Sequence, residues 1–362
     1  MRVARRAAEM EGDNDMSRKR RATSATGRGS KRAAVASGST PRSVPVAWLV
    51  SGLLLVIGLG SGWWLIGRSV SSESNAAPSS SGSIGGVADC RALPRFNERL
   101  GYKDRLGIST SERNYVGLVI FDGRIPLTAP VSERDLHQEP SWSEAGTLGP
   151  FVLDRQGHIY TAPVPRTAVS DNPPDVQNTI YRVDSDTAVM QPYLTLPDTP
   201  PASPQNPFGI LGMAYDCDSD ALYVSTVAGS TLSAEQGQIV RLDLETGTVT
   251  PQVVGVDAIG LAVFRGVQGK RLYFGLARES TLASVALDAE GHAVGDIRTE
   301  LNLTDYAGGM GEPKVRRISF ERETMTLYIV PFNFNLRAVS EQQQVIVRYH
   351  YDQQRDGWVV MP

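Results

Sequence analysis

A motif of two apolar strands around a polar turn occurs four times after residue 148, and this repetition constrains the fold more than any other feature. In each copy the second strand carries an aliphatic residue followed by tyrosine. The copies are GPFVLDRQGHIYTAPV from Gly149, LGMAYDCDSDALYVSTV from Leu211, GLAVFRGVQGKRLYFGLA from Gly260 and RRISFERETMTLYIVPF from Arg316. Their tyrosines, Tyr160, Tyr223, Tyr273 and Tyr328, are 63, 50 and 55 residues apart. Such self-similarity predicts a repeat architecture in which each unit buries its apolar face against the next.

A second pair of strands follows the first in every unit. These pairs lie in NTIYRVD from Asn178, GQIVRLDLETGTVT from Gly237, STLASVALDAEGHAVG from Ser280 and QQVIVRYHYD from Gln343. Four antiparallel strands in about 40 to 60 residues are typical of one blade of a β-propeller. We therefore predict an all-β fold, a propeller of five or six blades over residues 89–362.

The first blade is expected to be irregular. The segment NYVGLVIFDGRIPLTAP from Asn114 supplies its strands but lacks the tyrosine motif. We expect this region to pair with the final strand GWVVMP, because a propeller that leaves strand edges unpaired invites aggregation.

At these motifs the chain resembles the β-propeller superfamily that includes the gluconolactonase/senescence-marker-protein-like, strictosidine-synthase-like and NHL-repeat families. The resemblance covers residues 149–362 and is strongest at GILGMAYDCDSDALYVS, at GQIVRLDLETGTVT and at RLYFGLARESTLASVALDAEGHAVG. It implies six blades, and for the gluconolactonase-like members a divalent metal at the channel mouth. The corresponding positions here are Leu148, Leu211 and Ile259. Aliphatic side chains offer no oxygen ligand, so the lactonase activity is in question.

Four polar residues recur upstream of the tyrosines. Glu144, Asn206, Asp257 and Glu312 lie 16, 17, 16 and 16 residues before their tyrosine. Equivalent offsets in a radial fold place side chains on one face, so these four residues are candidates for a ring that binds a cation or a polyhydroxylated ligand. The alternative is that connecting loops are generally rich in such residues.

Asp216, Asp218 and Asp220 alternate as at the start of a calcium-binding loop, which makes Ca²⁺ a possible cofactor. The glycine and the later glutamate of such a loop are missing, so an ordinary acidic turn is the alternative reading.

The two cysteines, Cys90 and Cys217, both follow the apolar segment described next. A disulfide between them would clamp the start of the fold onto a blade, and two free thiols are the alternative.

Residues 46–67, VAWLVSGLLLVIGLGSGWWLIG, carry no charge. At about 1.5 Å per residue, such a helix is long enough to cross a bilayer, with Trp48 and Trp63 near its two ends. Residues 1–45 hold 11 basic and 4 acidic side chains, a balance of +7, which leaves −10 for the rest of a chain of net charge −3. Since basic flanks stay in the cytoplasm, we predict a signal anchor with an exported carboxy-terminal domain.

The remaining segments complete the predicted organisation. Residues 1–45 form a disordered cytoplasmic arm that lacks aromatic side chains, so we expect it to contact anionic lipid and no nucleic acid. Residues 68–88 form a stalk rich in serine and glycine. The resulting hypothesis is a membrane-anchored, extracytoplasmic propeller that binds a small molecule or an exported protein. A metal-dependent lactonase or hydrolase with a non-standard site is the alternative, and the sequence leaves open whether the protein is an enzyme.

Overall fold

The computed structural model describes residues 83–102, 105–112, 114–125, 134–165, 173–306, 312–331 and 344–362. The predicted cytoplasmic arm 1–45 and the predicted transmembrane helix 46–67 lie outside these residues. Within the described ranges, no helix combines the length and the apolarity that a membrane crossing requires.

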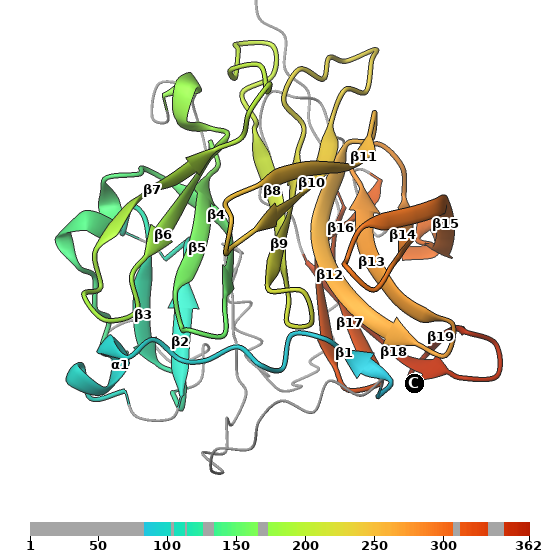
Figure 1. The fold of residues 1–362 in the computed structure, drawn as a ribbon, viewed down its shortest axis with the longest axis horizontal. Helices are drawn as coiled ribbons and strands as arrows, with labels where there is room; N and C mark the ends of the chain where they lie inside the picture. Colours follow the sequence, from blue (N-terminus) through green and yellow to red (C-terminus); the bar gives the residue numbers. More distant parts are fainter. Residues whose placement is uncertain are drawn as a thin grey trace, which may run out of the picture. The chain divides into compact units, whose positions relative to one another are not determined.

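Four sheets of four consecutive antiparallel strands account for most of the described fold (Figure 1). The first contains β4 (Leu148–Leu153), β5 (Ile159–Pro163), β6 (Thr179–Val183) and β7 (Met190–Thr195). The second contains β8 (Ile210–Asp216), β9 (Ala221–Thr226), β10 (Gln238–Asp243) and β11 (Val249–Val254). The third contains β12 (Ala258–Gly266), β13 (Gly269–Leu276), β14 (Thr281–Leu287) and β15 (Ala293–Asn302). The fourth contains β16 (Pro313–Glu321), β17 (Thr324–Pro331), β18 (Val345–Asp352) and β19 (Gly357–Val360).

A fifth, smaller sheet precedes these four. It consists of β2 (Leu106–Ser109) and β3 (Val119–Asp122). The short strand β1 (Gly85–Gly86) adds to the edge of β12 and so belongs to the third sheet. The described helices are all short: α1 (Phe96–Arg99) and the 3-10 helices η2 (Pro140–Ser143), η4 (Pro174–Val176) and η5 (Thr304–Tyr306).

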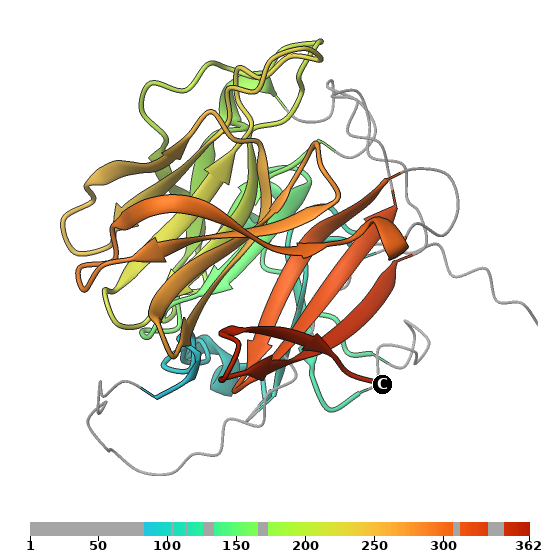
Figure 2. The same ribbon diagram turned by 90° about the vertical axis from the view of Figure 1, so that its right-hand side faces the viewer.

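The sheets form a β-propeller arrangement, as the repeats and the resemblance indicated. The first strands of neighbouring four-stranded sheets, β4, β8, β12 and β16, contact one another in that order, and Figure 2 shows the last sheet beside the third. Apolar clusters fill the space between successive sheets. Tyr160, Tyr223 and Tyr273 are buried in three of these clusters, which explains why the motif tyrosine recurs. Tyr328, in the last sheet, instead carries the guanidinium of Arg317 4.5 Å from its ring centroid.

The described residues contain four complete blades and one two-stranded sheet, against the predicted five or six blades. Among the described strands, β19 pairs with β18 and β3 pairs with β2, and the expected pairing between the first blade and the final strand is not present there. In the described residues, the two-stranded sheet of β2 and β3 is therefore separate from the sheet that contains β19.

Each inner strand is irregular near its start. The register shifts between Ile210 and Gly212 in β8, between Ile259 and Leu261 in β12, and at matching places in β4 and β16. Gly260 has a φ of +65°, and a Cβ atom there would lie 2.7 Å from the carbonyl oxygen of Arg316. The backbones of neighbouring inner strands therefore approach closely at this level, where only glycine fits without strain.

Residues 83–100 form a strap that runs along the lower edge of the view in Figure 1, from β1 to α1. The strap includes residues 83–88, which the sequence assigned to the stalk. Its backbone hydrogen bonds reach Arg322, Val263, Cys217 and Ser185, which belong to four different sheets or their turns. Phe96 in α1 is fully buried and anchors the far end of the strap against Trp142. One segment thus ties all four complete blades together.

Candidate functional site

Asn206 and Asp257, two of the four predicted site residues, lie in one buried hydrogen-bond network. The Nδ2 atom of Asn206 donates to the carbonyl oxygens of Val227, at 2.7 Å, and Ser230, at 3.0 Å. Its Oδ1 atom accepts from the backbone N–H of Phe208 at 3.1 Å. The Nδ2 atom therefore holds the chain that follows β9, and the Oδ1 atom holds the chain that leads into β8.

Asp257 contacts the same segment and is completely buried. Its Oδ1 atom accepts from the hydroxyl of Ser230 and from the N–H of Gly237, the latter at 3.1 Å. Its Oδ2 atom accepts from Nε of Arg278 at 2.7 Å. A buried carboxylate is stable only with such partners, and here a cation and two neutral donors supply them.

Together, Asn206 and Asp257 fix the loop that joins β9 to β10, residues 227–237, which we call the clamped loop. Ser230 links them, because its carbonyl oxygen accepts from Asn206 and its hydroxyl donates to Asp257. The equivalent offsets that singled out these two residues thus correspond to a shared structural role at the base of one loop.

Glu144 and Glu312 are placed differently. Glu144 is exposed and ends η2, where its N–H donates to the carbonyl oxygen of Ser141. Glu312 precedes β16, and its side chain is 61% exposed. Its carboxylate accepts from Nζ of the buried Lys314 at 2.8 Å. Of the predicted ring, Asn206 and Asp257 therefore share a hydrogen-bond network through Ser230, whereas the described hydrogen bonds of Glu144 and Glu312 lie elsewhere.

Arg278 and Glu235 complete the network and were not found from the sequence. Arg278 lies five residues after Tyr273, and the equivalent positions in the other repeats are Pro165, Ala228 and Asn333. A search for recurring residues cannot detect a side chain that only one blade carries. Glu235 is likewise a side chain that acts in one blade only. Its carboxylate accepts a hydrogen bond from the N–H of Asp257 at 2.8 Å within this one loop.

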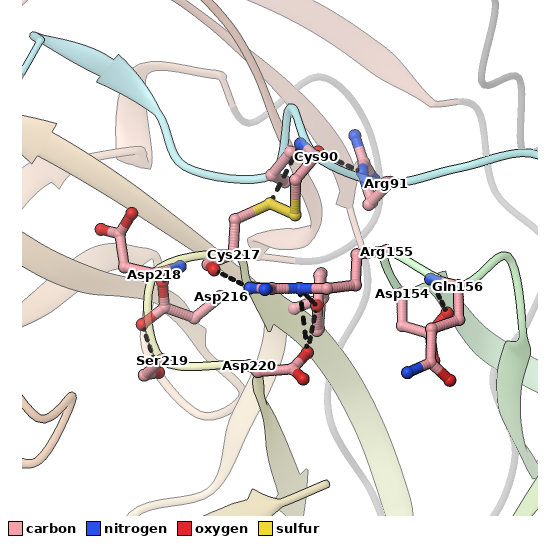
Figure 3. Close-up of a disulfide and its surroundings, with 12 residues drawn as sticks. Cys90, Arg91, Asp154, Arg155, Gln156, Asp216, Cys217, Asp218, Ser219 and Asp220 are labelled. Atoms are coloured by element: carbon pink, nitrogen blue, oxygen red, sulfur yellow. Dashed lines mark hydrogen bonds and ion pairs between the residues drawn. A yellow bond between two sulfur atoms is a disulfide. The ribbon is translucent and has the colours of Figure 1, made fainter. Parts of the chain in front are cut away.

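The structure joins Cys90 to Cys217 by a disulfide, the first of the two alternatives that the sequence left open (Figure 3). The bond connects the middle of the strap to the turn between β8 and β9. The N–H of Cys217 also donates to the carbonyl oxygen of Val87 at 3.1 Å, so a backbone hydrogen bond supports the same junction. On the next blade the strap continues with a 3.0 Å hydrogen bond from Ala92 to Asp154.

The acidic turn around Cys217 is held by basic side chains. Nζ of Lys270 lies 2.6 Å from Asp216 and 3.6 Å from Asp218, in the position between them that a bound cation would take. Asp220 faces Arg155, whose Nε lies 3.4 Å from its carboxylate (Figure 3). Burial, followed by the hydrogen bond to Asp220, raises the pKa of the Tyr215 hydroxyl, so this group stays protonated at neutral pH.

The positions that correspond to gluconolactonase-like metal ligands carry apolar side chains that pack in the interior of this fold. Leu148 and Ile259 are buried in apolar clusters, and Leu211 packs against two of them. Across the part of the chain that the structure describes, no three His, Cys, Asp or Glu side chains are grouped so that they could hold a metal ion.

Comparison with known proteins identifies relatives in structure only. No family model and no curated protein matches the chain. Regucalcin, a calcium-binding protein from Agrobacterium tumefaciens, is 14% identical, with 76% of this chain and 79% of that chain covered and a TM-score of 0.40. The PQQ-bound aldose sugar dehydrogenase from Streptomyces coelicolor is 15% identical over 75% and 80%, with a TM-score of 0.41. A hypothetical selenium-binding protein from Sulfolobus tokodaii is 10% identical over 71% and 62%, with a TM-score of 0.38. These likenesses carry no argument about ligand or activity.

Proposed function

We propose that this protein is a membrane-anchored, extracytoplasmic β-propeller that acts as a binding module for an exported protein or a small molecule. The observation that carries the proposal is the Cys90–Cys217 disulfide. Disulfides persist in oxidising compartments and are rare in the cytosol. The bond therefore favours a location outside the cytoplasm for the propeller, in agreement with the charge difference across residues 46–67.

The binding role is supported by a structural difference between the two ends of the strands. At one end, the strap and the ion pairs around Asp216 make the turns part of a rigid scaffold. At the other end, loops such as the clamped loop project from that scaffold (Figure 1). Rigid scaffolds that present loops at one end are a common basis for recognition. For the hydrolase alternative, the described residues offer no comparable supporting observation, because Leu148, Leu211 and Ile259 stand where metal ligands are needed.

The location is tested with the full chain in intact cells. A membrane-impermeant maleimide polymer should label neither cysteine before reduction and both Cys90 and Cys217 after reduction by an impermeant phosphine. As a matched control, a cysteine introduced by Ser24→Cys in the arm should react only after the membrane is permeabilised. Labelling of both native cysteines without a reductant, or only after permeabilisation, would contradict the proposal.

A further inference from the structure

The tip of the clamped loop is exposed along an unusually long stretch. All six residues from Thr231 to Gln236 are exposed, and Leu232 is 65% exposed. None of these side chains contributes to the apolar clusters between the sheets. Burial therefore does not hold the tip in place, and its order requires another cause.

Arg278 supplies that cause. Its two terminal nitrogens donate to the carbonyl oxygens of Thr231 at 2.6 Å, Leu232 at 3.3 Å and Ala234 at 3.1 Å. Its Nε atom is held by the buried carboxylate of Asp257 at 2.7 Å. One ion pair thus fixes three carbonyl groups of a segment that otherwise faces solvent. A planar guanidinium suits this task because its donors point in fixed directions.

The polar groups of the tip are also satisfied within the loop. The N–H of Thr231 donates to the carbonyl oxygen of Ala234 at 2.9 Å. The N–H groups of Ser233 and Ala234 donate to the hydroxyl of Thr231 at 3.3 and 3.1 Å. The one acidic side chain, Glu235, turns inward to the N–H of Asp257. Residues 231–234 therefore present only uncharged side chains, and Leu232 is the one large apolar side chain among them, whereas Glu235 is itself exposed.

A second loop, residues 197–206, lies beside the clamped loop in both views (Figures 1 and 2). A Cβ atom on Gly229 would lie 3.1 Å from Cγ of Pro200, which places the two loops in contact at their bases. Pro200, Pro201 and Pro204 are exposed. Proline has few conformations to lose, so this loop extends the surface with little entropic cost on binding.

We propose that the clamped loop is a preordered docking element whose Leu232 side chain enters an uncharged, apolar pocket on a partner protein. This inference rests on the proposed function, and it adds which surface binds the partner and to which class the partner belongs. A loop that is already ordered loses less conformational entropy on association, so ordering by Arg278 raises affinity without a new contact. A protein pocket fits better than a lipid surface, since residues 231–236 include one large apolar side chain and no lysine or arginine, and the nearby Arg278 is paired with Asp257.

The first experiment tests the clamp in the purified full chain in detergent. In Arg278→Met, the amide protons of residues 231–237 should exchange with solvent at least tenfold faster, while exchange in β9 and β10 stays unchanged. The matched control is Arg322→Met, on a turn at the strap end, which should leave the loop unchanged. Unaltered exchange of the loop in Arg278→Met would overturn the role given to the ion pair.

The second experiment tests docking in cells that naturally make the protein. A photoreactive amino acid at position 233 should give one protein adduct of discrete mass, and one at Val267, exposed in the β12–β13 turn at the strap end, should not. Leu232→Asp should reduce the adduct at least tenfold, Leu232→Met should preserve it, and Arg278→Met should weaken it.

Several outcomes would overturn the docking proposal. They are an adduct that survives Leu232→Asp, labelling of lipid in place of protein at position 233, and equal labelling at positions 233 and 267. An adduct at position 267 with none at position 233 would reject the clamped loop and leave the proposed binding function standing. The cysteine-labelling experiment decides the location independently of all these results.

Discussion

The buried network at the base of the clamped loop makes Asp257→Ala a strongly destabilising substitution. Substitution of a residue outside the apolar strands usually costs within about 0.5 kcal/mol, because such residues contribute little burial. In the structure Asp257 is fully buried and accepts from Ser230, Gly237 and Arg278. The substitution removes all three interactions at once.

The size of the loss in unfolding free energy follows from the partners that Asp257→Ala leaves without an acceptor. Removing one member of a buried ion pair costs about 3 to 5 kcal/mol, and a buried donor without an acceptor costs about 1 to 3 kcal/mol. Arg278 retains 22% side-chain exposure and its carbonyl acceptors, so water and these acceptors recover part of the loss. We therefore expect Asp257→Ala to lower the free energy of unfolding by about 3 to 5 kcal/mol in all. For a domain of this size that corresponds to a fall in Tm of roughly 10 °C.

Thermal unfolding of the propeller domain, followed by far-ultraviolet circular dichroism, measures this effect. Asn206→Ala should cost about 1 to 3 kcal/mol, since it leaves a buried N–H of Phe208 and two carbonyl groups without their partner. Glu312→Ala is the matched control and should stay within about 0.5 kcal/mol, because its side chain is 61% exposed. Equal Tm values for Asp257→Ala and Glu312→Ala would refute the structural role and return Asp257 to the candidates for ligand binding.

Three further predictions concern the scaffold. The double variant Cys90→Ser/Cys217→Ser should lose up to about 5 kcal/mol in unfolding free energy, because the bond closes a loop of sequence separation 127, and adding a reductant should change the wild type but not the variant. Gly260→Ala should cost about 2 to 4 kcal/mol in urea unfolding, against about 1 to 2 kcal/mol for Gly247→Ala, because both have positive φ but only Gly260 meets a backbone atom. Backbone hydrogen bonds from Thr187 and Thr246 lower the pKa of Asp184 and Asp243, respectively. The contribution of these two carboxylates to folding stability is complete above the unfolded-state pKa near 4 and is lost as pH falls through the lowered folded-state pKa. Urea midpoints measured from pH 6 to 3 should therefore fall less in Asp243→Asn than in the wild type.

The repeat motif was sufficient to predict the blades because the same physical contact recurs in each. Tyr160, Tyr223 and Tyr273 each fill the space toward the next sheet, so the residue type and its spacing repeat with the packing. The sequence carries a further repeat at the outer hairpins. Asp184, Asp243, Asp288 and Asp352 begin the outer hairpin turn of each blade, and each accepts hydrogen bonds from the backbone of that turn. Asx turns of this kind mark a hairpin and locate the outer strand pair in every unit.

Features carried by a single blade could not be predicted in the same way. The strap has almost no pattern in sequence, since residues 83–89 read SIGGVAD and resemble the preceding stalk. Its order comes from Gly86, which approaches Phe320 too closely for any side chain, and from Phe96 at its far end. Arg278 likewise acts once, on one loop. Periodicity detects what a fold does repeatedly, whereas an interaction made once leaves no periodic signal.

The strap and the disulfide have a shared consequence for how the blades stay together. In the described residues the final strand β19 pairs within its own sheet, so no mixed sheet of first and last strands joins the two ends of the chain. The strap helps to hold the blades together in place of such a sheet, because it forms hydrogen bonds with all four complete blades in turn. The hydrogen bonds of a two-residue strand are individually weak, and the Cys90–Cys217 bond holds the middle of the strap even when they open. Cohesion of the blades is therefore coupled to the redox state of one bond, and it is preserved wherever that bond stays oxidised.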